Sequence, residues 1–109
     1  MIFAFQQTMG FWDIDNIKLS NSTFTLNVFQ DGGFESGSLV PNYRQCQSVG
    51  NVSNSTQFSG RYCYSDRTQG QFGYLMQNVS TTVGSQYYLQ FYLQNRGGSN
   101  GSFAVLLGR

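Results

Sequence analysis

The sequence predicts an all-β fold, an antiparallel β-sandwich, and three observations lead to it. Ten Phe, seven Tyr and one Trp in 109 residues are too many large apolar groups for a disordered chain, and they supply a core. Lys and Glu occur once each, so the residues that build surface helices are scarce. Short segments of alternating apolar and polar residues are separated by Gly, Asn and Ser clusters, which is typical of strands and turns.

The first expected strand has Trp12 and Ile14 on one face, and its inward phase resumes at Ile17 and Leu19. That three-residue step predicts a β-bulge at residues 15–16.

A second strand is expected at 24–29, where Phe24, Leu26 and Val28 alternate with polar residues and with Phe29. The sequence Asp31-Gly-Gly then breaks the pattern. Residues 40–57 are polar and show no clear period, so we expect a long loop there.

Short strands are expected at 61–64 and 74–80, and the clearest strand follows at 87–94. Its core-facing side chains are expected to be Tyr87, Leu89, Phe91 and Leu93. The side chains that face away from the core, which we call the outward row, are Tyr88, Gln90, Tyr92 and Gln94. A loop at 95–101 leads to a last strand at 103–107.

Composition excludes several function classes. A formal net charge of +1 offers no basic patch for nucleic acid. No apolar run approaches the roughly 18–20 residues that cross a bilayer, so no membrane span is expected. The chain has no His, which removes the commonest general base and the usual partner of a nucleophilic Ser or Cys. We therefore expect a protein that is not an enzyme.

An extracellular or cell-surface location is expected, because amides and hydroxyls rather than charges supply the surface polarity. Five Asn-x-Ser/Thr sequons agree with it, although a chain so rich in Asn and Ser also produces sequons by chance. They begin at Asn21, Asn51, Asn54, Asn78 and Asn100.

The two cysteines, Cys46 and Cys63, are expected to form a disulfide in an oxidising compartment, which would stabilise the fold by roughly 3 kcal/mol. The alternative is two buried free thiols. The first eight residues lack the basic region and cleavage site of a signal peptide, so we expect a fragment of a longer secreted protein.

Several segments resemble galactose-binding-like jelly-roll modules of secreted repeat proteins, which are similar to carbohydrate-binding modules of the family 4 and 9 type. Residues 11–19, Phe-Trp-Asp-Ile-Asp-Asn-Ile-Lys-Leu, resemble the closing strand of these modules. Residues 31–39, Asp-Gly-Gly-Phe-Glu-Ser-Gly-Ser-Leu, resemble their opening strand. Residues 59–66, 74–77 and 83–93 are similar to three strands that follow. Asp31 replaces the usual Asn, and Tyr43 follows Pro41 where a Trp is usual.

The resemblance implies a particular domain organisation, because the closing motif precedes the opening one. Residues 1–20 would be the closing strand of a preceding module, and residues 24–109 would be the opening two-thirds of a second, incomplete jelly-roll sandwich. As the opening and closing strands are neighbours in this fold, residues 11–19 could instead fill the vacant place, as in a circular permutant.

The outward row is the first candidate site. Tyrosine rings stack on the C–H faces of sugars, and amides and arginine bond their hydroxyls, so Tyr88, Gln90, Tyr92 and Arg96 are expected to bind a glycan. The alternative is that the two tyrosines pack under a neighbouring loop. Three residues are weaker candidates for the same surface: Arg61, Tyr62 and Tyr64.

Asp15 and Glu35 form the second candidate site. The resemblance implies a structural Ca²⁺ near the opening and closing strands, and these two carboxylates fall on those motifs. Asp13 is a weaker candidate. The alternative is that both are ordinary surface or turn carboxylates, and no other cofactor is expected.

Together these features favour a non-catalytic carbohydrate-binding or adhesion module, with neighbouring repeats of the parent chain as partners. A structural β-sandwich spacer without a ligand is the alternative function. A glycosidase built on a carboxylate pair ranks third, because none of the five acidic residues lies in a recognisable motif.

Overall fold

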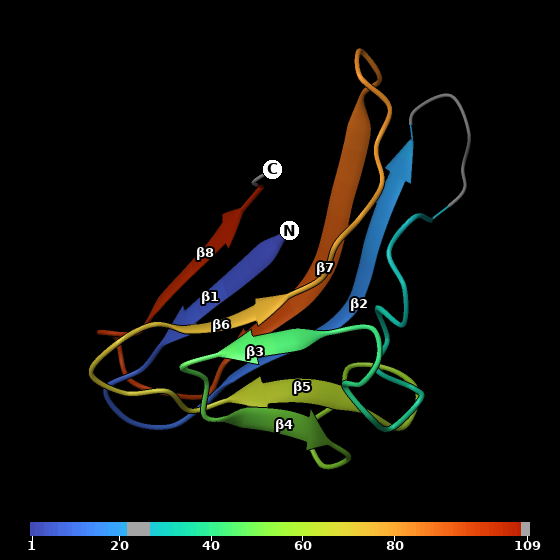
Figure 1. Ribbon diagram of the computed structural model, residues 1–109. Coiled ribbons are helices and arrows are strands. Elements are labelled where there is room, and N and C mark those ends of the chain that lie inside the picture. The colour runs from blue at the N-terminus through green and yellow to red at the C-terminus, as the bar shows by residue number, and fades with distance from the viewer. Residues whose placement is uncertain (22–26, 108–109) are drawn as a thin grey trace.

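The computed structural model describes residues 1–21 and 27–107, which form eight strands and, within those ranges, no helix (Figure 1). The first four strands are β1 (Ile2–Gln6), β2 (Trp12–Asn21), β3 (Arg44–Cys46) and β4 (Gly50–Ser53). The others are β5 (Cys63–Asp66), β6 (Gly73–Met76), β7 (Tyr87–Asn95) and β8 (Ser102–Leu106). None of the described segments is a helix long and apolar enough to span a membrane.

The strands form two antiparallel four-stranded sheets, in the orders β3-β6-β1-β8 and β4-β5-β2-β7. The predicted all-β sandwich is thereby confirmed, whereas the jelly-roll topology stays a prediction. The central strands β1 and β2 pair with neighbours on both sides. The two segments that the resemblance divides between modules, 1–20 and 24–109, therefore contribute strands to the same two sheets.

The bulge predicted in the first long strand is present. The register of β2 against β7 shifts between Asp15 and Lys18, and Asn16 adopts a left-handed φ of 56°. The extra residue turns both Ile14 and Ile17 toward the core, where both are buried. Gly32 packs directly behind the bulge, since a Cβ there would lie 1.9 Å from the carbonyl oxygen of Ile17.

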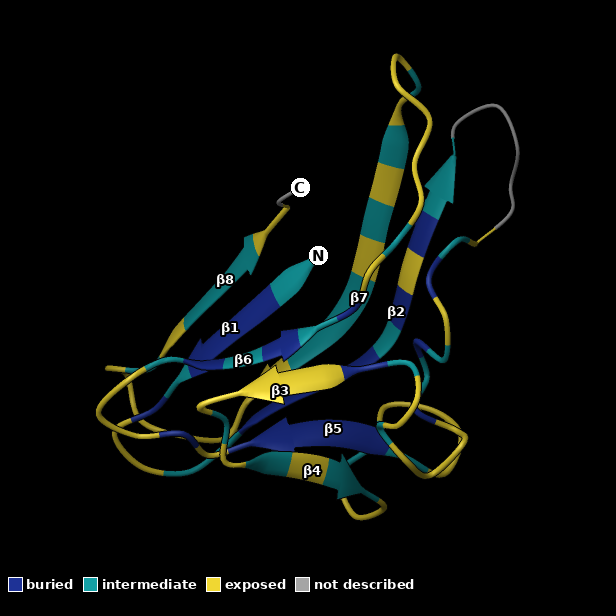
Figure 2. Ribbon diagram, viewed as in Figure 1, coloured by how far each residue is buried: buried dark blue, intermediate teal, exposed yellow. Residues whose placement is uncertain are grey.

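The core is built from aromatic rings contributed by both sheets. Phe3 of β1 lies 5.9 Å from Phe91 of β7, and Phe5 lies 5.7 Å from Tyr64 of β5, measured between ring centroids. The ring of Phe34 stacks 5.9 Å from that of Tyr64. Full burial of each such ring stabilises the fold by about 2–3 kcal/mol. Figure 2 shows the resulting concentration of buried residues in β1, β2 and β5.

Several expected elements differ from the structure. Residues 31–39, expected as an opening strand, form turns in which Phe34 reaches the core. The expected loop at 40–57 contains the short strands β3 and β4. The strand β1 was not expected, and residues 24–26, half of the expected strand at 24–29, lie outside the described residues.

Strand β7 forms one edge of its sheet, and β8 forms one edge of the other. Figure 1 shows β1 and β8 diverging from β2 and β7 toward the chain termini. The core-facing side chains of β7 are consequently only half-buried, although they pack against the buried cluster.

Candidate functional site

The outward row lies on the outer face of the sheet β4-β5-β2-β7, the face turned away from the core. Tyr88 and Gln90 are exposed, whereas their neighbours Tyr87 and Leu89 pack against the core. The alternation predicted for 87–94 is present in the structure, with Tyr92 half-buried instead of exposed. One side of β7 is therefore available to solvent along most of its length.

Tyr92 is half-buried because another aromatic ring covers it. Phe58, in the loop between β4 and β5, stacks on Tyr92 with ring centroids 4.2 Å apart and an interplanar angle of 21°. Phe58 itself is 55% exposed, so the ring that faces solvent here is that of Phe58. Phe58 was not predicted as a site residue, because its only signal in the sequence is that of a large apolar residue within a polar loop.

The loop that carries Phe58 is held to β2 by a buried carboxylate. Asp15 accepts hydrogen bonds from the backbone N–H groups of Phe58 and Ser59, at 2.9 and 3.2 Å, and a third from Asn16 at 2.7 Å. Burial raises the pKa of Asp15, the three amide donors oppose that shift, and the nearby charge of Glu35 adds to it. Asp15 thus positions the aromatic stack.

The cross-strand neighbours of the outward row come from β2. Ser20 lies opposite Tyr88, and Lys18 lies opposite Gln90. A shallow hollow of about 220 Å³ lies between Lys18, Gln90, Phe58 and Tyr92. This end of the outer face therefore combines aromatic rings with an amide, an amine and a hydroxyl.

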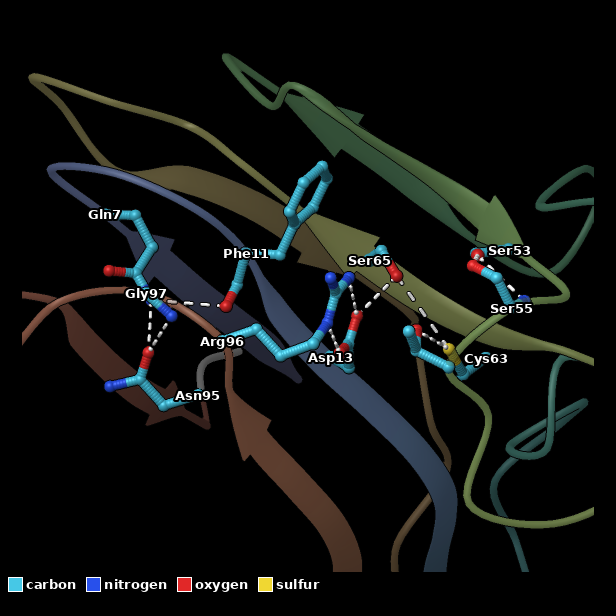
Figure 3. A network of polar contacts seen from close by, with 11 residues as sticks. Gln7, Phe11, Asp13, Ser53, Ser55, Cys63, Ser65, Asn95, Arg96 and Gly97 are labelled. Carbon is cyan, nitrogen blue, oxygen red and sulfur yellow. Dashed lines mark hydrogen bonds and ion pairs between the residues drawn. The ribbon is translucent and has the colours of Figure 1, made fainter.

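Arg96, the fourth residue expected to bind a glycan, follows β7 and is fixed by Asp13 of β2 (Figure 3). Its Nε and Nη2 atoms donate to the two oxygens of that carboxylate, the second at 3.0 Å, and Ser65 also donates to it. Hydrogen bonding to Asp13 raises the pKa of Arg96. Asp13 is therefore the partner of an arginine and not a calcium ligand.

The ring of Phe11 forms a cation–π contact with Arg96, because its centroid lies 4.6 Å from Cζ of the guanidinium. The backbone holds the two residues together, since the N–H of Arg96 donates to the carbonyl of Phe11 at 2.7 Å. Gln7 Nε2 bonds the same carbonyl at 3.3 Å and the side chain of Asn95 at 2.6 Å. The guanidinium is consequently held in one orientation on the outer face.

A larger hollow of about 620 Å³ lies on the same face, beside Arg96. Serines of β4 and β5, Asn51 and Arg67 line it together with Arg96 and Phe11. Neither Phe11 nor Arg67 was singled out by sequence analysis. The lining residues come from three separate parts of the sequence, namely 11, 48–67 and 96, and are brought together only by the folded sheet.

The residues expected to hold Ca²⁺ do not fit it. Glu35 accepts hydrogen bonds from the N–H groups of Arg61 at 2.7 Å and Tyr62 at 2.9 Å, and Asp15 accepts the three described above. Amide N–H dipoles present positive charge to these oxygens, which stabilises a bare carboxylate and disfavours a cation. Within the described ranges, no group of three acidic or Cys side chains could hold a metal ion. Both residues instead anchor the loop before β5.

The expected disulfide is wrong for this structure, which holds both thiols free. Cys46 ends β3 in one sheet and is exposed, whereas Cys63 begins β5 in the other sheet and is buried. The Sγ atom of Cys63 lies near the hydroxyls of Thr56 and Ser65, at 3.5 and 3.8 Å.

The weaker glycan-binding candidates lie elsewhere. Tyr64 is fully buried, and its hydroxyl contacts Ser48 at 2.6 Å and Asp66 at 2.9 Å, so it belongs to the core. Tyr62 is half-buried against the core cluster, while Arg61 is exposed in the loop that Glu35 anchors. Tyr64 is therefore excluded from any surface site.

The chain was also compared with known proteins. No family model, no curated protein and no solved structure matches it. The geometry of the outer face therefore carries the functional inference.

Proposed function

We propose that this chain is a non-catalytic carbohydrate-binding or adhesion module, and that the outer face of the sheet β4-β5-β2-β7 binds the glycan. The observation that carries the proposal is the pairing of exposed aromatic rings with exposed amides on one face of the sheet. Tyr88 is 60% exposed and is followed two residues later by exposed Gln90. Phe58 adds a second exposed ring above Tyr92.

The chemistry of these groups suits a sugar. Aromatic rings bind the C–H faces of a pyranose, and amides and hydroxyls exchange hydrogen bonds with its hydroxyl groups. Tyr88 and Tyr92 are four residues apart on one strand, which places them about 14 Å apart along β7. Such a spacing suits an oligosaccharide that lies along the strand.

The proposal also covers the location of the protein and the domains that flank this chain. Four of the five sequon asparagines are exposed, namely Asn51, Asn54, Asn78 and Asn100, which would leave them accessible to glycosylation in a secreted protein. We place the chain in an extracellular multi-domain protein, related to galactose-binding-like jelly-roll modules and flanked by further repeats. The motif in 11–19, most of which lies in strand β2, supports this placement.

A structural spacer without a ligand is the second candidate, and one observation favours it. The stacking of Phe58 on Tyr92 is the packing under a neighbouring loop that this alternative expects. The two candidates differ at Tyr88 and Gln90, which no such loop covers in the described structure.

Glycan-array binding of the wild-type chain and three variants tests the proposal. Tyr88→Ala and Gln90→Ala should each weaken binding about tenfold or more, while Gln71→Ala, at an exposed position just before β6 of the other sheet, should not change it. Circular dichroism verifies that each variant is folded. If the folded wild-type chain binds no glycan, the spacer function is supported and the proposal fails.

A further inference from the structure

The hollow of about 620 Å³ beside Arg96 has the size of a small-ligand site, for which volumes of about 300–1,000 Å³ are usual. It lies at the opposite end of the outer face from Tyr88, over the outward-facing side chains of β4 and β5. Figure 3 shows Arg96, Ser65, Ser53 and Ser55 arranged across this part of the sheet, with Phe11 standing beside Arg96.

The hollow carries more positive than negative charge. Arg67 is exposed, and its guanidinium makes no hydrogen bond or ion pair with the described residues. Arg96 uses Nε and Nη2 to bind Asp13 and keeps the N–H groups of Nη1 free. Among the described residues, no carboxylate lines the hollow. One excess cation thus remains after Asp13 neutralises Arg96.

Asp66, which precedes Arg67 in the sequence, forms no ion pair with it. Asp66 is completely buried, and its two oxygens accept hydrogen bonds from Ser48 at 2.6 Å, Tyr64 at 2.9 Å and Thr68 at 2.6 Å. Arg67 is exposed and lines the hollow. Its charge is therefore available to a ligand.

Neutral hydrogen-bonding groups surround the two arginines. Ser53 and Ser55 lie with their hydroxyl oxygens 3.0 Å apart, and Asn51 presents an exposed amide beside them. Hydroxyls and amides donate and accept hydrogen bonds, as sugar hydroxyls do. The two arginines can therefore donate hydrogen bonds to an oxyanion, while the serine hydroxyls and the Asn51 amide can bond the hydroxyl groups of the same ligand.

We propose that this hollow is a subsite for the carboxylate or sulfate group of an acidic saccharide, with Arg67 and Arg96 as the residues that bind the oxyanion. The inference rests on the proposed function, since the saccharide bound by the outward row would extend into the hollow. Arg96 lies four residues beyond Tyr92 and thus about 14 Å further along the direction of β7. A saccharide on the outward row would reach the hollow at that end. Arginine suits the task because its planar N–H groups bind carboxylate and sulfate oxygens in pairs.

Titration calorimetry with two matched trisaccharides tests the inference. One is a trigalacturonate, and the other is the neutral galactose trisaccharide of the same linkage, which has a hydroxymethyl group in place of each carboxylate. The acidic sugar should bind about tenfold more tightly at low salt, and added salt should weaken only its binding. A sulfated galactose trisaccharide separates sulfate from carboxylate recognition.

Variants assign the effect to the hollow. Arg67→Gln should lower the affinity for the acidic sugar about tenfold and leave the neutral sugar unchanged, whereas Arg44→Gln, an exposed arginine in the other sheet, should change neither. Equal affinities for the acidic and neutral sugars, or no effect of Arg67→Gln, would overturn the inference.

The outcomes also separate this inference from the proposed function. If both sugars bind equally and both are lost in Tyr88→Ala, the glycan function stands and the subsite fails. If the acidic sugar binds, is lost in Arg67→Gln and is unaffected by Tyr88→Ala, the subsite stands and Tyr88 takes no part in binding this trisaccharide. If neither sugar binds the folded chain, both are overturned.

Discussion

Arg96 and Asp13 form an ion pair that joins the end of β7 to the start of β2, across 83 residues of sequence. The two partners differ in environment, since the Asp13 side chain is 2% exposed and that of Arg96 is 31% exposed. Loss of the ion pair would leave a buried, unpaired charge at Asp13, which costs more free energy than an unpaired charge at the more exposed Arg96. The pair therefore fixes the edge strand β7 and presents the remaining guanidinium N–H groups to the outer face.

Removal of Arg96 should destabilise the fold. Arg96→Ala leaves the Asp13 carboxylate with Ser65 as its remaining side-chain donor, and the free energy of unfolding should fall by about 2–3 kcal/mol. Urea unfolding followed by circular dichroism measures this loss. The double variant Asp13→Asn with Arg96→Ala should lose less than Arg96→Ala alone, because no buried charge is then left unpaired. A loss under about 0.5 kcal/mol for Arg96→Ala would contradict the role of the pair.

The two tyrosines of the outward row should differ in their effect on stability. Tyr92→Ala removes the ring that supports Phe58 and should cost about 1–2 kcal/mol. Tyr88→Ala removes a ring that is 60% exposed and should change stability by less than about 0.5 kcal/mol. Thermal unfolding of both variants in parallel distinguishes them. Equal losses would mean that the stack does not hold the loop.

Calcium should have no effect on stability. The oxygens of Glu35 and Asp15 are bonded by backbone amides, so the melting temperature should be the same in excess CaCl₂ and in EDTA. Differential scanning calorimetry in both buffers measures it. Glu35→Gln should lower the melting temperature in either buffer, since one of the two amide contacts is lost. A rise with CaCl₂ that Glu35→Gln abolishes would restore the calcium site.

The two thiols should react at different rates. Cys46 is exposed, whereas Cys63 is buried and burial raises the pKa of its thiol, so less of the reactive thiolate is present. Ellman's reagent at pH 8 should label one thiol rapidly in the native chain and the second only in urea. Absence of any reactive thiol before reduction would indicate the disulfide that the structure lacks.

The contribution of Asp15 to the free energy of unfolding should decrease as pH rises in the acid range. Its pKa is raised by burial in the folded chain, so the folded chain keeps a proton that the unfolded chain loses at a pH of about 4. The free energy of unfolding therefore decreases as pH rises from about 4 through the raised pKa. Urea titrations at pH 4 to 6 should give a less negative slope for Asp15→Asn than for wild type. Parallel profiles would refute this assignment.

Local pattern was sufficient to predict the fold class and the long strands. The alternation of 87–94 and the three-residue step before Ile17 depend only on neighbouring residues, and both the outward row and the bulge were predicted correctly. The break at Asp31-Gly-Gly was predicted correctly, but the strand that the resemblance placed at 31–39 is absent. Phe34 enters the core from a turn and mimics a strand residue. Strand β1 had no clear alternation, since its three central residues, which point to alternate faces of the sheet, are all buried.

The site was only partly predictable, because its composition depends on contacts that are distant in sequence. Tyr88 and Gln90 could be placed on a surface from β7 alone. Phe58 joins them only because Asp15 bonds its loop, and Arg67 reaches the same face only because β5 pairs with β2. The loop-anchoring roles of Asp15 and Glu35 were missed for the same reason, since four of their five amide donors lie 26 to 44 residues away.

Mapping of backbone amide shifts by NMR during a titration with the neutral and acidic galactose trisaccharides tests the central claim most directly. If the outer face binds the glycan, amides of β7, of residues 15–20 in β2 and of the Phe58 loop should shift in a saturable manner, while those of β1 and β8 should not. The acidic sugar should also shift Arg67. Saturable shifts confined to β1, β6 and β8, or no shifts with either sugar, would contradict the account.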